Sequence, residues 1–275
     1  STPVQTKDFT LDLNINLSRN VSKVKELADG VDYLFFNGDA NFPINVGTRV
    51  GHRLGEIYAK NLYKRDENGN MIVNKQGRPT KVSGEDAFQY TLDHPIGNIE
   101  PGLLMSVSPS FTYKGFTLSA LFDMKFGGDI VSVSEAMATS TGLAARTANR
   151  GNAENGWKIV APGVTADGTV NSTAMNAQRY YTSMSGMAEE FVYDASFIKL
   201  KELSLGYSFP KSILKKTPLT SLNVAFVARN LAYLMKHTPR TSPEGGYDTS
   251  MFSQAIDYMS VPYTRTFGLS INLGF

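Results

Sequence analysis

The chain has 275 residues, of which 27 are Lys or Arg and 25 are Asp or Glu, so its formal net charge of +2 gives no electrostatic reason to expect a nucleic acid or an acidic partner. It contains no cysteine, which excludes disulfides, thiolate metal sites and thiol nucleophiles. No apolar run approaches the 18 or so residues of a membrane helix, so any membrane crossing would use barrel strands.

The first predicted strand covers residues 9–17, where apolar and polar residues alternate. Side chains in a strand point alternately to opposite faces, so this pattern gives one apolar and one polar face. The apolar residues are Phe9, Leu11, Leu13, Ile15 and Leu17, and the polar ones are Thr10, Asp12, Asn14, Asn16 and Ser18. Residues 50–60 are expected to form an ascending strand, with Gly47, Gly51 and Gly55 as small residues on its inner side.

Residues 103–126 predict a hairpin of two strands, each long enough to cross a bilayer. The alternation runs to Tyr113, pauses at Lys114-Gly115, and restarts at Phe116. A Gly in the second position of a two-residue turn supplies the positive φ that a tight hairpin needs.

Three further strands are expected, over residues 203–209, 222–229 and 265–275. The last reads RTFGLSINLGF, with bulky residues on one parity and small or polar residues on the other, and it ends on Phe275. The pattern therefore gives about seven strands in all, which is too few and odd for a closed single-chain barrel.

These strands share a uniformly bulky apolar face and a small, polar face. The interior of a soluble barrel would mix large and small apolar residues to fill space, so the pattern favours an all-β fold of antiparallel transmembrane barrel strands. A soluble β-sandwich that binds carbohydrate remains the alternative, since its half-buried strands have the same period. An enzyme is not expected, because no convergent polar site can be named.

The unequal connections predict an orientation. Outer-membrane barrels have short periplasmic turns and long outer loops, so residues 127–196 and 235–262 are expected to be extracellular. Arg265 and Lys199 are expected at the outer rim, where lipid-facing cations can reach phosphates. The periplasmic interface is expected to carry an aromatic girdle of Tyr113, Phe116, Tyr207, Phe209 and Phe275.

Candidate chemistry is sparse. The three histidines are scattered, without a metal-binding pattern, so neither a metal nor another cofactor is expected. Residues 66–70 predict a hairpin turn rather than a calcium loop, and Glu189-Glu190 a solvated loop edge rather than a catalytic pair. Four loop residues are candidates for contacting a substrate, such as a sugar ring or a peptide, or a protein that covers the loop, with packing of the loop as the alternative for its aromatic residues: Trp157, Arg179, Tyr180 and Tyr181.

Several motifs carry a family resemblance over nearly the whole chain. They include IGNIEP at 96–101, YKGF at 113–116, FGGDI at 126–130, DASFIKLKELSLGYSFPKSILKK at 194–216, ARNL at 228–231, SPEGGY at 242–247 and PYTRTFGLSINLGF at 262–275. In order and spacing they resemble the late barrel of the SusC/RagA family of TonB-dependent outer-membrane transporters.

The resemblance implies the carboxyl-terminal part of a plugged 22-stranded barrel, with the plug absent from these residues. It further implies import of oligosaccharides or oligopeptides across the bacterial outer membrane. The implied partners are a SusD-like surface lipoprotein, TonB acting through the missing amino-terminal part, the remainder of the barrel, and outer-membrane lipid with lipopolysaccharide.

Overall fold

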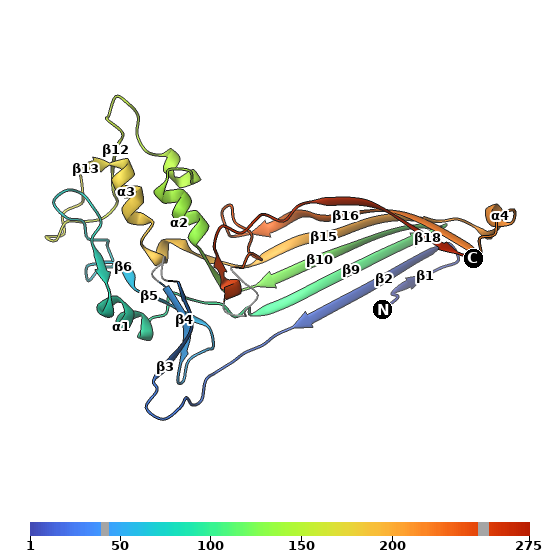
Figure 1. The fold of residues 1–275 in the computed structure, drawn as a ribbon, viewed down its shortest axis with the longest axis horizontal. Coiled ribbons are helices and arrows are strands. Elements are labelled where there is room, and N and C mark those ends of the chain that lie inside the picture. Colours follow the sequence, from blue (N-terminus) through green and yellow to red (C-terminus); the bar gives the residue numbers. More distant parts are fainter. Residues whose placement is uncertain (40–43, 247–252) are drawn as a thin grey trace.

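The computed structural model describes residues 1–39, 44–246 and 253–275, and its largest element is a seven-stranded antiparallel sheet (Figure 1). The strand order β1-β2-β9-β10-β15-β16-β18 follows the chain, with β1 and β18 at the two edges. The strands are β1 (Val4–Gln5), β2 (Phe9–Ser18), β9 (Leu103–Tyr113), β10 (Phe116–Phe126), β15 (Phe197–Ser208), β16 (Ser221–Lys236) and β18 (Thr266–Gly274). The all-β fold predicted from the alternation is confirmed.

The register aligns the apolar residues of six strands in continuous rows on one face. Paired residues share a face of the sheet, so each row follows directly from the pairing. One row runs across the strands through Leu11, Phe111, Leu118, Leu205, Phe226 and Leu269. The row beside it on the opposite face consists of small or polar residues in its first four strands: Asp12, Ser110, Ser119 and Ser204.

The apolar face is exposed. Leu269 is 65% exposed, and Leu205 and Phe226 are 53% and 52% exposed. A β-sandwich would bury such a face against a second sheet, and the described residues supply no sheet that covers it. The structure therefore does not support the sandwich alternative.

Three long insertions, residues 19–102, 127–196 and 237–265, gather at one end of the sheet, which we call the loop domain (Figure 1). Its small sheets contain β3 (Tyr33–Asp39), β4 (Ile44–Arg49), β5 (Glu56–Ala59) and β8 (Gly97–Asn98); β6 (Asn61–Tyr63) and β7 (Lys81–Ser83); β11 (Asp129–Ser132), β14 (Val192–Asp194) and β17 (Ile256–Asp257); and β12 (Lys158–Val160) and β13 (Ala174–Asn176). All three insertions contribute to one buried core, with Ile57, Phe191 and Ile256 among its members. Part of the predicted loop 235–262, including Tyr247 of the SPEGGY motif, lies outside the described residues.

The helices are α1 (Glu85–Asp93), α2 (Val133–Ser140), α3 (Ala177–Met184) and α4 (Lys211–Leu214), with single 3-10 turns at Ala145–Ala148, Ala188–Phe191 and Ser253–Ala255. None of the helices in the described ranges has the length and apolar character needed to span a membrane. The helix α4 lies in the connection between β15 and β16, at the end of the sheet opposite the loop domain (Figure 1).

The predicted membrane strand at residues 50–60 is wrong. This segment belongs to the loop domain, where a turn joins β4 to β5. Gly51 and Gly55 have φ values of 85° and 74°, which are left-handed values found in turns and not in strands. A Cβ on Gly55 would lie 2.4 Å from Ile99, so its small size is required for packing. The seventh strand of the large sheet is instead the short β1.

Candidate functional site: the polar face of the sheet and the loop domain

The end of the sheet opposite the loop domain carries tight connections and aromatic residues. Lys114 and Gly115 both have positive φ, at 47° and 91°, as a type I′ hairpin turn requires. The ring centroids of Phe116 and Tyr207 are 4.5 Å apart, and those of Tyr207 and Phe209 are 5.0 Å apart. Tyr113 pairs with Phe116, and Phe275 follows the last residue of β18. All five residues of the predicted girdle therefore lie at the same end.

The polar face carries paired charges in the half of the sheet nearer the loop domain. Lys201 Nζ donates to Asp123 Oδ2 at 2.7 Å, and Arg229 Nε donates to Glu202 Oε2 at 2.8 Å. Further along, Asn16 Nδ2 donates to Ser106 Oγ at 3.3 Å. This face can therefore offer donors and acceptors to a polar solute.

A β-bulge in β15 turns the side chains of the preceding residues to the opposite faces of the sheet from those that unbroken alternation would give. Glu202 pairs with Leu121, whereas Leu200 pairs with Phe122, so Lys201 is an extra residue in β15. Lys199 then shares the polar face with its partner Asp123. The expectation that Lys199 faces lipid at the outer rim is wrong, because it assumed unbroken alternation along the strand.

Lys199 is only 2% exposed and forms the centre of a cluster. Its Nζ donates to Glu244 Oε2 at 2.6 Å and lies 5.1 Å and 4.8 Å from the ring centroids of Tyr233 and Tyr263. The Tyr233 hydroxyl also donates to Glu244. An ion pair with two aromatic faces compensates the cost of removing the ammonium from water. The segment after β16 is thereby fixed to β15.

A cavity of about 720 Å³ lies beside this cluster, between β16, α2 and residues 257–265. Its wall includes both signs of charge, with Lys236 and Arg265 among the cations and Glu135 and Asp257 among the anions. Such a mixed lining suits a polar, uncharged or zwitterionic solute better than an apolar one. Arg265 is exposed and borders this cavity.

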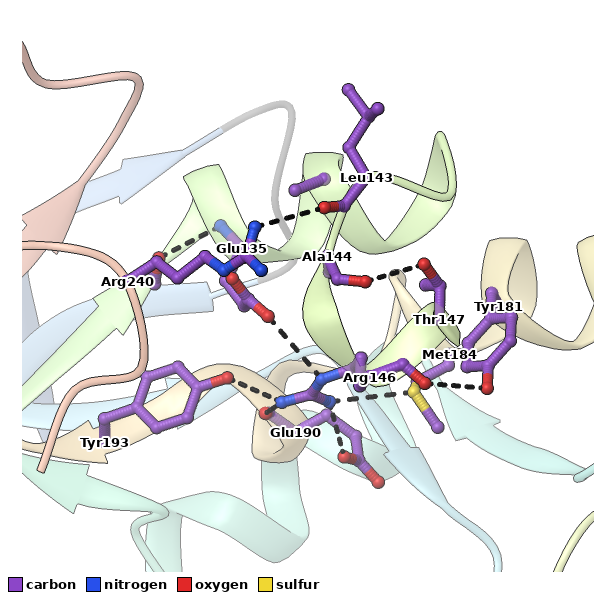
Figure 2. A network of polar contacts seen from close by, with 12 residues as sticks. Glu135, Leu143, Ala144, Arg146, Thr147, Tyr181, Met184, Glu190, Tyr193 and Arg240 are labelled. Carbon is purple, nitrogen blue, oxygen red and sulfur yellow. Dashed lines mark hydrogen bonds and ion pairs between the residues drawn. The ribbon is translucent and has the colours of Figure 1, made fainter. Parts of the chain in front are cut away.

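Arg146 organises the loop domain (Figure 2). Its guanidinium donates to Glu190 Oε2 at 3.2 Å and to the Tyr193 hydroxyl at 2.7 Å, and its Nε lies 3.7 Å from Glu135 Oε1. The Phe191 ring centroid lies 5.0 Å from Arg146 Cζ. One planar side chain thus joins α2, the 3-10 turn at Ala188–Phe191 and β14. Burial raises the pKa of Tyr193 to about 12, so its hydroxyl stays neutral and accepts from Arg146.

Glu189 and Glu190 are not a solvated loop edge, so that expectation is wrong. Their side chains are 24% and 28% exposed. Glu189 Oε1 accepts from the Tyr63 N–H at 2.8 Å, and its other oxygen lies 3.3 Å from Arg65. The 3-10 turn directs the two neighbouring carboxylates to different partners. The sequence alone does not reveal these partners, because they lie far away in the chain.

The four candidate contact residues fall into two groups. Tyr180 and Tyr181 are each 7% exposed and pack with Ala161 and Met175 in a small core. Trp157 is 50% exposed, and Arg179 is exposed on the first turn of α3. Burial of the two tyrosines favours the packing alternative for that pair.

The tyrosine pair is also anchored through its polar atoms. The Tyr181 hydroxyl lies 2.9 Å from the carbonyl oxygens of both Arg146 and Asn149, and can donate to either. Burial raises the pKa of Tyr180 to about 12. These contacts tie α3 to the turn that carries Arg146.

The histidines have separate environments. His52 Nδ1 lies 3.1 Å from Glu56 Oε2, His94 stacks on Tyr90, and His237 contacts Asp194. Among the described residues, no group of three or more His, Asp or Glu could hold a metal ion. Residues 66–70 form the expected turn, in which Asp66 Oδ1 accepts from two later backbone N–H groups.

The sequence did not single out Glu244 or Arg146, and it assigned Lys199 to the wrong face. A signal for the bulge exists in Lys199-Leu-Lys-Glu202, where three charged residues within four positions break the clean alternation that begins at Leu203. No local pattern identifies Arg146, since its partners lie up to 47 residues away in the chain.

The curated relatives of this chain described below are both named TonB-dependent receptors. No family model matches the chain. It is 27% identical over 290 residues to the TonB-dependent receptor P3 of Formosa agariphila, covering 99% of this chain and 27% of that protein. It is 28% identical over 222 residues to the TonB-dependent receptor SusC of Bacteroides thetaiotaomicron, covering 75% of this chain and 19% of that protein.

Solved structures agree on the fold. The RagAB peptide importer in its open-open state matches 100% of this chain and 27% of its own, with a TM-score of 0.62 and 17% identity. The closed-closed state of the same importer gives a TM-score of 0.63 at 18% identity. The chain thus spans about a quarter of the length of P3 and of the RagAB chain, and the resemblance seen in its motifs is confirmed.

Proposed function

We propose that this chain, which is SusC/RagA-like and forms the carboxyl-terminal barrel portion of a TonB-dependent receptor, supplies wall strands and outer loops to an outer-membrane importer. The observation that carries the proposal is the seven-stranded sheet itself. One face is apolar and exposed, the other is polar with paired charges, and one end bears a folded loop domain.

The exposed apolar face supports contact with lipid. Soluble proteins rarely leave so wide an apolar surface in water. The aromatic residues of the short-turn end, among them Tyr113 and Phe116, would then lie at the periplasmic interface. By the same orientation the predicted loops 127–196 and 235–262 would be extracellular, and so would the insertion 19–102.

The polar face would line the lumen. The edges β1 and β18 would pair with the remainder of the barrel, because unpaired backbone groups cost several kcal/mol each in hydrocarbon. Oligosaccharides or oligopeptides are the proposed cargo: the family resemblance of the sequence implies both, and the similar solved structures are of a peptide importer. A SusD-like lipoprotein would close the outer side, TonB would act through the part of the receptor outside this chain, and lipopolysaccharide would contact the outer rim.

Trp157 and Arg179 are the proposed contacts with cargo or with the lipoprotein. Both are exposed in the loop domain, where a flat aromatic face and a guanidinium suit either a sugar or a peptide. Tyr180 and Tyr181 would act indirectly by holding this surface in shape.

Uptake by cells that carry the full-length receptor tests the proposal. Fluorescent pools of oligosaccharides and of oligopeptides should enter the periplasm only when both the receptor and TonB are present. Trp157→Ala with Arg179→Gln should reduce uptake without lowering the amount of receptor in the outer membrane. Recovery of the receptor in another cell fraction, or uptake that is independent of the receptor, would refute the proposal.

A further inference from the structure

A second cavity, of about 490 Å³, lies in the loop domain at the amino end of α3. It shares no lining residue with the cavity beside Lys199. Its volume falls in the range of small-ligand sites. Its lining includes one tryptophan, one arginine and several hydroxyl and amide side chains. None of the described residues that line it carries a carboxylate.

Trp157 is held in an unusual backbone conformation at this cavity. Its φ is 56°, in the left-handed region that non-glycine residues rarely adopt. The Trp157 N–H donates to Asn152 O at 2.8 Å, and its carbonyl accepts from Ala177 N–H at 3.0 Å. These two bonds fix the residue while half of its surface stays exposed. A strained residue held by its surroundings is often found at a binding site.

The electrostatic environment of the cavity favours an anion. Arg150 uses Nη1 to donate to Gly142 O at 3.4 Å, which leaves other N–H groups of its guanidinium for a ligand. The amino end of α3, with the positive end of its helix dipole, borders the same space, and its Ala177 N–H already donates to Trp157 O. Asn176 caps the Arg179 N–H, whereas the Gln178 N–H has no acceptor within the described part of the chain.

An independent observation comes from Thr139, which lines the cavity from the carboxyl-terminal turn of α2. Thr139 is 0% exposed, and within the described residues its hydroxyl has no hydrogen-bond partner. A buried polar group without a partner costs about 1–3 kcal/mol, so such groups are rare and usually have a function.

We infer that this cavity binds an acidic sugar residue of the cargo, a pyranose that carries a carboxylate. The sugar ring stacks on the Trp157 indole, and the carboxylate accepts from Arg150 and from the first turn of α3. The surrounding hydroxyls and amides match the hydroxyls of a saccharide, whereas apolar peptide side chains would find few partners. This inference rests on the proposed import function and narrows its substrate class.

Binding to the purified full-length receptor tests the inference, with calorimetry as the readout. The probes are trisaccharides of galacturonate, glucuronate and mannuronate, their neutral counterparts of galactose, glucose and mannose, and tri-glutamate. At least one acidic trisaccharide should bind ten or more times as tightly as its neutral counterpart. Arg150→Gln should remove that preference, a loss on the order of tenfold.

Matched variants separate a site from a general effect on folding. Trp157→Ala should weaken the binding of the acidic trisaccharide about tenfold, and Trp157→Phe should restore most of it, because the flat ring is kept. Arg78→Gln, which removes an exposed arginine outside the cavity, should change nothing.

Three results would overturn the inference: no acidic trisaccharide binds better than its neutral counterpart, Arg150→Gln leaves binding unchanged, or tri-glutamate binds as tightly and with the same dependence on Arg150. The uptake assay remains separate. Normal uptake without acidic-sugar binding would refute only this inference, whereas binding without receptor-dependent uptake would refute only the import function.

Discussion

Lys199 Nζ lies 2.6 Å from Glu244 Oε2, and this ion pair joins β15 to the segment that follows β16. The lysine side chain is 3% exposed and the glutamate side chain 18%. A charge buried this deeply is tolerated only with a partner. The pair therefore fixes the segment that follows β16 to β15, beside the larger cavity.

Lys199→Met should loosen the segment that follows β16, because Glu244 loses its ionic partner while its side chain stays largely buried. We expect the free energy of local opening around residues 240–246 to fall by about 3 kcal/mol, measured as faster hydrogen exchange. Lys201→Met is the matched control, since the Lys201 side chain is 47% exposed and its pair with Asp123 should contribute about 1 kcal/mol or less. Equal hydrogen exchange in the two variants would contradict the role of Lys199 in fixing this segment to β15.

Arg146→Lys should destabilise the loop domain although the charge is kept. A lysine cannot reproduce the planar fork that reaches Glu190 and Tyr193 together, and the lost charged hydrogen bonds are each worth about 1.5–3 kcal/mol. Limited proteolysis of the full-length receptor in detergent should show earlier cleavage within residues 140–190. Arg65→Lys, at a more exposed arginine, should leave the pattern unchanged.

Tyr181→Ala should cost about 3–5 kcal/mol of loop-domain stability, as for other large aromatic truncations in a core. Tyr181→Phe keeps the packing but removes the hydroxyl between two carbonyls, so about 1 kcal/mol is expected. Trp157→Ala should have little effect on stability, because the indole is half exposed. Thermal unfolding of the loop domain, followed by hydrogen exchange, should rank the three variants in that order.

Acid should release the junction where β15 and β16 meet the loop domain. Burial acts to raise the pKa of Asp194, but hydrogen bonds from Ser196 and His237 outweigh it, and the net pKa is lowered. A carboxyl with a lowered pKa in the folded state stabilises above its unfolded pKa, and that contribution is lost as pH falls through the folded pKa. Below about pH 4 we therefore expect faster exchange at residues 195–197 and 237–238. Asp194→Asn should abolish this dependence on pH, and a dependence that persists in that variant would point to another group.

The sequence predicted the strands of the large sheet because the features that define them depend on residues close together in the chain. Alternation sets the two faces, and Lys114-Gly115 sets the hairpin, so residues 103–113 and 116–126 match β9 and β10 residue for residue. The same reasoning failed at Lys199, since one extra residue at Lys201 reverses every side chain beyond it.

The loop domain could not be predicted in the same way. Its core joins segments far apart in the chain, such as Ile57, Phe191 and Ile256, and no periodicity reports such contacts. Residues 50–60 were placed in the wrong sheet because a short buried hairpin and a membrane strand have similar local patterns. Of the candidate site residues, Trp157 and Arg179 remain exposed, while burial of Tyr180 and Tyr181 depends on partners that the sequence does not reveal.

The most direct test of the central claim compares two adjacent substitutions in β18, Leu269→Arg and Ser270→Arg, in the full-length receptor. Leu269 belongs to an apolar row and is 65% exposed, and Ser270 lies on the opposite face, paired with Ala225. If the apolar face contacts lipid, Leu269→Arg should cost about 2–4 kcal/mol and lower the yield of folded, heat-resistant receptor in the outer membrane, whereas Ser270→Arg should cost much less. Equal folded yields, or a greater loss for Ser270→Arg, would contradict the assignment of the two faces and with it the proposed membrane barrel.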